Sequence, residues 1–260
     1  MNRFAIEGLY FADDMFASDA ARALEICKLM VERGIHERLQ WGGQLHSSMA
    51  NRKTLDAMRR AGCFRIEIGV ESGSPKILAA MNKKASPEKH LSAIRLCQEL
   101  GFEVFVNIIL GFPGEELEDA ESTLALVREA GPDNISVNRF IPLPGSPIFH
   151  ELRVGGHLDS DWSRYSVGND FNFSSMQDEQ LNLYTELMYN SVHVHKISTL
   201  EKKGSCNGKA LSDEEVIAAK NQLLCEQHTV LENLKREIVR LNIAWRESQK
   251  EIRRLSENMR

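Results

Sequence analysis

The sequence is poor in cysteine, with five among its 260 residues, and these five lie far apart. An odd number of scattered cysteines is not typical of a disulfide framework. None of their spacings matches the ligand runs of a zinc site or an iron–sulfur cluster. We therefore interpret all five as buried or unreactive thiols: Cys27, Cys63, Cys97, Cys206 and Cys225.

The sequence also lacks a long hydrophobic run, a signal peptide and an excess of positive charge. No stretch approaches the roughly 18 apolar residues of a membrane-spanning helix, and the N-terminus has neither the basic nor the apolar region of a secretory signal. With 32 basic and 37 acidic residues the net charge is −5, so charge gives no argument for binding nucleic acid or an anionic membrane. We expect a cytoplasmic, globular protein.

Five β-like segments alternate with amphipathic helical segments over residues 1–150. The predicted strands are residues 4–11, 39–45, 64–70, 103–110 and 135–141. The helices between them have clear ends: Ser86-Pro87 begins one and Gly101 ends it, while Ser18-Asp19 and Gly34 bound another. Repeated βα units of this length predict a parallel sheet, either doubly wound or curved into an incomplete (β/α) barrel.

Residues 151–203 are less regular and are expected to add a helical extension to this core, with one helix over residues 178–195. Residues 204–211 contain the segment Gly-Ser-Cys-Asn-Gly and are expected to be a linker.

Residues 212–260 have the pattern of one long helix. Ser212 and Glu215 form a capping box. Apolar residues then recur every seven positions, at Ile217, Leu224, Leu231, Ile238, Trp245 and Ile252. This heptad pattern predicts a coiled coil that joins two copies of the chain. The alternative is a long helix that packs on its own core.

In a parallel α/β sheet the chemistry belongs at the carboxyl ends of the strands, where loops converge. The first predicted strand ends at Asp13 and Asp14, which could bind a cation, accept hydrogen bonds from an ammonium, or cap the next helix. Gln44 and His46 follow the second strand; a lone histidine is most often structural.

The later strands also end in polar side chains or in glycines. Glu71 and Ser72 follow the third strand, where they could bind paired hydroxyl groups, and Ser74 is the expected helix cap. The fourth strand leads into Gly111, which lets backbone approach a ligand closely or only makes a turn. The fifth strand carries Asn138 and ends among prolines.

Together and in this order, these segments resemble the radical S-adenosylmethionine (SAM) superfamily, and within it the cobalamin-binding branch. The matching segments are F-A-D-D-M-F, A-G-C-F-R-I-E-I-G-V-E-S-G-S followed by I-L…M-N-K, I-L-G-F-P-G-E, and P-L-P-G-S-P-I-F. The resemblance covers residues 3–195. It implies a partial barrel that holds SAM and a [4Fe–4S] cluster and cleaves SAM to a 5′-deoxyadenosyl radical. In the cobalamin branch the usual outcome is methyl transfer.

The resemblance also implies roles for particular residues. Asp13 and Asp14 would accept the SAM ammonium, and Gln44 and His46 would meet its carboxylate. Glu71 and Ser72 would contact the ribose and methionine portions. Backbone around Ile109 and Gly111, and around Ile141, would flank the adenine, and Asn138 is expected to rim the same hollow as Asp14 and Glu71.

One departure from the family pattern is large. The cluster motif Cys-x3-Cys-x2-Cys is absent from this sequence. The chain is expected to be either a fragment that begins after the first βα unit or a relative that has lost redox chemistry. As written, we expect it neither to hold a cluster nor to cleave SAM. Two other functions stay open: an inactive barrel that acts as an interaction protein through its coiled coil, and an ordinary barrel enzyme that binds phosphate or a nucleotide. The last is disfavoured because the sequence has no glycine-rich phosphate loop.

The coiled-coil hypothesis makes a direct prediction. Deletion of residues 212–260 should halve the mass measured by sedimentation equilibrium, because the apolar seam would join two chains. Trp245→Lys should weaken association by several kcal/mol, since it places a charge in that seam. An unchanged mass after the deletion would contradict dimerisation through this segment.

Overall fold

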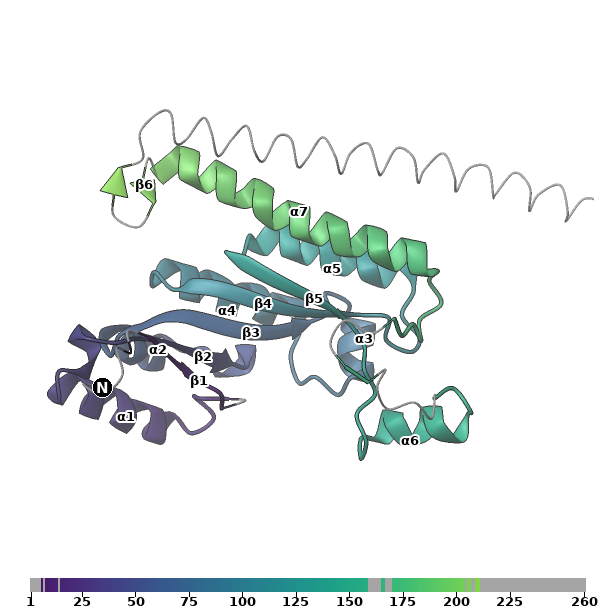
Figure 1. Cartoon of the computed structure of the whole chain (residues 1–260), viewed down its shortest axis with the longest axis horizontal. Helices are drawn as coiled ribbons and strands as arrows, with labels where there is room; N and C mark the ends of the chain where they lie inside the picture. Colours follow the sequence, from purple (N-terminus) through teal and green to yellow (C-terminus); the bar gives the residue numbers. More distant parts are fainter. Residues whose placement is uncertain are drawn as a thin grey trace, which may run out of the picture. The chain divides into compact units, whose positions relative to one another are not determined.

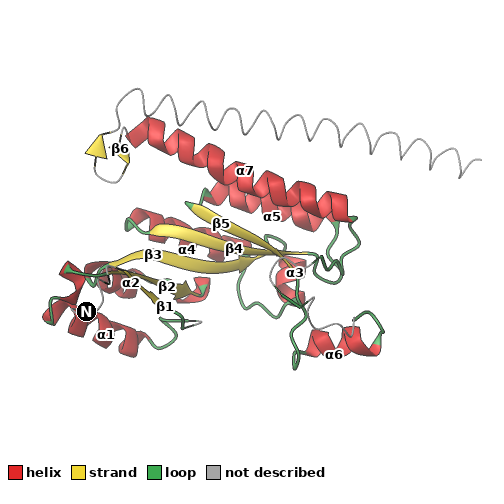
Figure 2. Cartoon of the chain, in the orientation of Figure 1, coloured by secondary structure: helices red, strands yellow, loops and turns green. Residues whose placement is uncertain are grey.

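The computed structural model describes residues 6, 8–13, 15–158, 165–166, 170–203, 205–206 and 209–210, with side chains as far as residue 196. Five parallel strands form one sheet: β1 Gly8–Phe11, β2 Gln40–Leu45, β3 Cys63–Glu71, β4 Glu103–Leu110 and β5 Asn134–Arg139. Their order in the sheet is their order in the chain (Figures 1 and 2). Every crossover therefore places a strand beside its predecessor, as in a half-barrel and unlike a doubly wound sheet.

Helices connect successive strands. The connections are α1 Ala20–Glu32 with η1 Ile35–Glu37, then η2 Ser47–Met49 with α2 Arg52–Arg60, then α3 Pro75–Ala80 with α4 Pro87–Glu99, and finally α5 Leu117–Ala130. Two further helices follow the sheet, α6 Pro147–Val154 and α7 Asp178–Lys203. The five strands and the incomplete barrel confirm the predicted fold class.

The helix boundaries follow from capping residues. Ser86 caps α4 by accepting a hydrogen bond from Lys89 N, with Pro87 at the first helical position. Asp19, of the expected Ser18-Asp19 pair, caps α1 by accepting from Ala21 N and Arg22 N. These side chains satisfy backbone N–H groups that have no partner within the helix.

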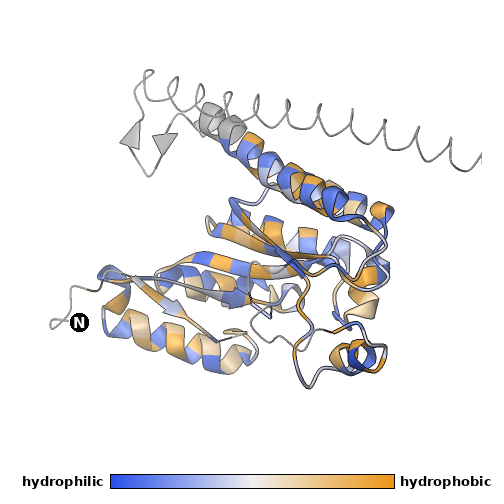
Figure 3. Ribbon diagram, turned by 45° about the vertical axis from the view of Figure 1, so that its right-hand side comes forward, coloured by the Kyte–Doolittle hydropathy of each residue, from blue (hydrophilic) through white to orange (hydrophobic). Residues whose placement is uncertain are grey.

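The two faces of the sheet differ in polarity. On β3 the alternate residues Ile66, Ile68 and Val70 are fully buried and belong to the hydrophobic core. Arg65 and Glu67, which occupy the other set of alternate positions, are half-buried. The same alternation runs along β4, and Figure 3 shows hydrophobic and hydrophilic residues interspersed along the strands and helices. Because the core contains residues of α1, α2, α4, α5 and α7, the helices pack on the outer face. The inner face of the half-barrel is polar.

α7 extends the outer layer beyond the sheet. It lies along α5 (Figure 1), where Tyr184 Oη donates to Glu121 at 3.2 Å and Arg128 Nε donates to Ser191 at 3.3 Å. The hydroxyl of Tyr189 accepts from Val137 N at 3.1 Å. α7 therefore supports β5 at the edge of the sheet.

The cysteines of the core are as expected. Cys27, Cys63 and Cys97 are free and buried. Burial raises the pKa of the Cys27 thiol to about 11 and that of Cys97 to about 12, and it also raises the pKa of Cys63. These thiols are therefore neutral and unreactive at physiological pH.

Residues 197–260 form a second compact unit. Within the expected linker, β6 Ser205–Cys206 pairs with β7 Lys209–Ala210 in a short antiparallel hairpin. The predicted coiled coil at 212–260 lies outside the described residues. Among the helices that the structure describes, none is long and apolar enough to cross a membrane.

Candidate functional site

A cavity of about 730 Å³ opens at the carboxyl ends of β3, β4 and β5. Its walls come from these strand ends, from the residues that end and follow α3, and from the segment that leads into α6. The lining residues are Glu71, Ala80, Met81, Asn82, Lys83, Asn107, Ile108, Ile109, Phe112, Asn138, Arg139, Phe140, Ile141, Leu143, Ser146, Pro147 and Ile148. The wall is thus apolar for the most part, with a few polar groups that converge on it.

The structure brings four of the predicted site residues together in this cavity. Glu71, Ile109, Asn138 and Ile141 all line it. Gly111 adjoins it through the next residue, Phe112, and has φ of 85°. The meeting of these residues follows from the parallel sheet, since the strands deliver their carboxyl ends to one edge.

The polar centre of the cavity is an ion pair between Glu71 and Lys83. Lys83 Nζ lies 2.9 Å from Glu71 Oε1, and the two side chains are only 19% and 20% exposed. Glu71 has φ of 64°, a left-handed conformation that is uncommon for residues other than glycine. Such backbone strain is typical of residues held in place at functional sites.

Gly69 makes room for this ion pair. A Cβ at Gly69 would lie 2.9 Å from Lys83 Nζ and would overlap the Glu71 carboxylate. Sequence reasoning did not select Lys83 as a site residue. The sequence nevertheless contains a signal for this residue, because Lys83 is the last residue of the M-N-K segment on which the family resemblance partly rests.

Ser72 lies next to Glu71 but its side chain turns away from the cavity. It is fully buried, its Oγ is 3.1 Å from Thr123 Oγ1, and it accepts from Ser74 N at 3.1 Å. Ser74, the predicted cap of α3, donates to Asp119 Oδ1 at 2.6 Å. Ser72 therefore fixes the loop to α5, and this hydrogen bonding explains its burial without a ligand.

The polar residues after β1 and β2 lie apart from the cavity wall. Asp13 is paired with Arg22 at 3.1 Å on an exposed surface, and Asp14 is outside the described residues. Gln44 is half-buried on β2, in register with Glu67. His46 Nδ1 is 2.7 Å from Ser48 Oγ. Burial, and then the positive charge of Lys83, lower the pKa of His46.

The G-F-P-G-E loop after β4 is organised by a buried carboxylate. Glu115 is fully buried, and its Oε2 accepts from Gly111 N at 2.6 Å and from Phe112 N at 3.2 Å. Its Oε1 has no hydrogen-bond partner among the described residues. Burial raises the pKa of Glu115 to about 7, although the two backbone N–H groups oppose that shift. Glu115 thus holds the loop whose Phe112 lines the cavity.

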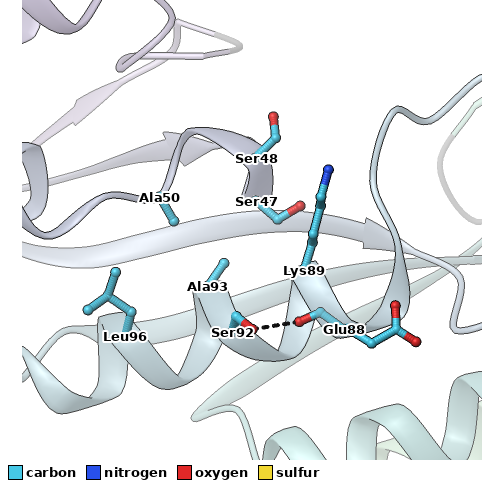
Figure 4. Close-up of a pocket in the computed structure, with 8 residues that line it drawn as sticks. All are labelled: Ser47, Ser48, Ala50, Glu88, Lys89, Ser92, Ala93 and Leu96. Atoms are coloured by element: carbon cyan, nitrogen blue, oxygen red, sulfur yellow. Dashed lines mark hydrogen bonds between the residues drawn. The ribbon is translucent and has the colours of Figure 1, made fainter.

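A second, smaller cavity of about 360 Å³ lies between η2 and α4 (Figure 4). Ser47, Ser48, Lys89 and Leu96 are among its lining residues. The Ser47 hydroxyl lacks a partner among the described residues but is inaccessible to water. None of the predicted site residues lines this cavity, so we place the site in the larger one.

No group of three His, Cys, Asp or Glu side chains that could hold a metal ion occurs in the part of the chain that the structure describes.

The comparison with protein families agrees with this geometry. Residues 6–127, which span β1 to most of α5, match the model of the Radical SAM superfamily. This segment belongs to the radical SAM superfamily. The match contains Glu71, Lys83 and the G-F-P-G-E loop, so the radical SAM segment supplies much of the cavity wall.

Individual relatives and solved structures are similar to parts of this chain. The chain is 26% identical over 166 residues to an uncharacterized methyltransferase of Pyrococcus horikoshii, a match that covers 63% of this chain and 36% of the relative. A structure of the radical SAM methyltransferase TsrM from Kitasatospora setae, with cobalamin and a [4Fe–4S] cluster bound, is 20% identical, covers 57% of this chain and 30% of that chain, and has a TM-score of 0.52.

The apo form of the cobalamin-dependent SAM radical enzyme OxsB gives a TM-score of 0.54 at 13% identity, over 90% of this chain and 48% of that chain. At these identities the two structures show a shared fold. This chain spans only about a third of the length of the Pyrococcus methyltransferase.

The raised pKa of Glu115 predicts a pH dependence of stability. The native state holds this proton between the ordinary pKa of 4.5 and the native value of about 7. Its contribution to the free energy of unfolding is therefore complete below pH 4.5 and is lost as pH rises through 7. Glu115→Gln should make the free energy of unfolding less sensitive to pH between 5 and 8, by up to about 3 kcal/mol.

Urea unfolding of both proteins at pH 5 and pH 8 measures this difference. Glu129→Gln, at a mostly exposed position of α5, the helix that follows the Glu115 loop, is the control and should keep the pH dependence of the parent chain. An identical pH dependence in Glu115→Gln would contradict the assignment.

Proposed function

We propose that this chain provides the SAM-binding edge of a radical SAM enzyme, and that the enzyme transfers a methyl group with the help of cobalamin. The observation that carries the proposal is the cavity in which the Glu71–Lys83 pair, Ile109 and Asn138 meet. The family match and the methyltransferase names of relatives support it.

The residues present fit SAM. The cavity volume lies within the range of small-molecule sites. Ile109, Phe112, Phe140 and Ile141 offer an apolar wall for a purine. Glu71 and Lys83 offer an acceptor and a donor for the ribose hydroxyls and for the charged ends of the methionine portion.

The described residues do not fit an iron–sulfur cluster. Cluster iron is held by cysteine thiolates, and the three cysteines of the barrel are buried in its core with raised thiol pKa values. The described residues therefore supply no ligand for a cluster that could reduce SAM. The proposed use of cobalamin is supported only by the names of similar structures. No described residue of this chain is assigned to bind cobalamin.

The role of this chain's residues is to bind and orient SAM. The Glu71–Lys83 pair is held in one arrangement by the left-handed backbone of Glu71 and the space above Gly69. A preorganised pair loses little freedom when a ligand binds, which favours one pose of the sulfonium. The apolar wall excludes water from the adenine, and Glu115 keeps Phe112 in that wall.

Binding of S-adenosylhomocysteine tests the proposal without requiring the cluster. Isothermal titration calorimetry should detect binding to the full chain. Lys83→Met should weaken that binding about tenfold, because it removes a charge-assisted hydrogen bond. Lys28→Met is the control, since Lys28 is exposed on α1, away from the cavity, and it should bind as the parent chain does. No binding by the parent chain, or equal binding by the two variants, would overturn the proposal.

A further inference from the structure

The polar inner face of the half-barrel continues below the cavity toward the amino ends of the strands. Asn107 lines the cavity on β4 and is in register with Gly69 on β3 and Ser136 on β5. Glu67 lies two residues before Gly69 on β3, in register with Phe105. It therefore stands about 7 Å deeper than Asn107 along the strand direction. Asn107 therefore lies at the cavity and Glu67 lies deeper on the same face of the sheet.

Asn107 has unused hydrogen-bonding capacity. Its side chain is half-buried on a central strand, and it makes no hydrogen bond with another side chain or the backbone within the described residues. Its neighbour Asn138 differs in this respect, because its Nδ2 donates to Ser136 Oγ at 2.9 Å. A half-buried amide loses part of its hydration, and a ligand that occupied the cavity would bury it further. A complementary group on that ligand offsets this cost.

Glu67 is a carboxylate without a cationic partner among the described residues. It accepts one hydrogen bond, from Tyr10 Oη at 2.9 Å. The charged groups that flank it on the inner face are engaged with each other: Arg65 with Glu103 at 2.7 Å and Lys83 with Glu71 at 2.9 Å. Arg139 faces the outer helix α7, where it pairs with Asp178 at 3.2 Å, and Lys196 of α7 donates to Asn134 Oδ1 at 2.8 Å, two strands from Glu67. Negative charge is therefore left uncompensated at Glu67.

We propose that the substrate of this enzyme carries an amine, which binds the Glu67 carboxylate on the inner face of the half-barrel beside Asn107. This inference rests on the proposed function, since it takes the cavity above to be occupied by SAM. An amine donates to both the Asn107 carbonyl oxygen and Glu67, and its positive charge matches that of the uncompensated carboxylate. An apolar substrate would leave the Asn107 amide without a hydrogen-bond partner and Glu67 without a counter-charge, and an acidic substrate would be repelled.

Three four-carbon probes that differ only in their end groups test the inference: 1,4-diaminobutane, butane-1,4-diol and succinate. Each is titrated into the full chain saturated with S-adenosylhomocysteine, while the side-chain amide signals of Asn107 are followed by NMR. The Asn107 signals are identified by their loss in Asn107→Asp. The diamine should shift these signals and bind about fivefold more tightly than either other probe.

Two variants separate binding from structure. Glu67→Gln should abolish the preference for the diamine, whereas Glu32→Gln, at an exposed position of α1, should retain it. Tyr10→Phe removes the hydrogen bond to Glu67 but leaves the carboxylate, and should also retain the preference. If Glu67→Gln does not fold, the retained preference in Tyr10→Phe and its reversal to succinate in Glu67→Lys supply the test.

Equal or tighter binding of succinate to the parent chain, or a diamine preference that survives in Glu67→Gln, would overturn the inference. Its failure is distinguishable from failure of the proposed function. In the first case S-adenosylhomocysteine still binds and only the selectivity among probes is absent, whereas in the second S-adenosylhomocysteine itself does not bind.

Discussion

The packing of helices against only one face of the parallel sheet is the constraint on which the rest of this structure depends. Burying Ile66, Ile68 and Val70 against the outer helices stabilises the half-barrel. Because side chains alternate along a strand, the same packing places Arg65 and Glu67 on the inner face. The polar interior is thus a geometric consequence of the hydrophobic core. The parallel direction of the strands then places their functional ends at one edge.

At that edge, several backbone and electrostatic costs are offset locally. Glu71 has left-handed backbone, yet its carboxylate gains an ion pair with Lys83. Glu115 is buried with one unpartnered oxygen, yet its other oxygen accepts two backbone N–H groups and so orders the loop after β4. Both arrangements cost stability and both fix groups around one cavity. Locally destabilising arrangements of this kind are characteristic of binding sites, where geometry matters more than stability.

Much of the fold could be predicted from the periodicity of hydrophobic residues and from the residues that cap helices or end strands. The expected strand at residues 103–110 matches β4 in full, because its apolar run is bounded by Gly101 and Gly111. The expected strand at residues 4–11 matches β1 only over Gly8–Phe11. The strand ends predicted that Glu71 and Asn138 would meet, and the family resemblance added Ile109 and Ile141; all four line the cavity. Lys83 could not be found in this way, because it follows a helix and reaches the cavity only through its pairing with Glu71.

The contrast between Glu71 and Ser72 shows why strand periodicity alone fails at the end of β3. The pairing of β3 with β4 shifts there, so that Gly69 opposes Asn107 but Glu71 opposes Ile108. This bulge, together with the positive φ of Glu71, directs the Glu71 carboxylate back over Gly69 and into the cavity. The chain then turns, with Ser72 N donating to Val70 O at 2.8 Å, and the Ser72 hydroxyl meets Thr123 on α5. A regular strand would have sent neighbouring side chains to opposite faces but would not have placed the carboxylate beside Lys83. The bulge therefore turns the Glu71 carboxylate to the cavity and leaves the Ser72 hydroxyl to anchor the loop to α5, a division that only the three-dimensional register reveals.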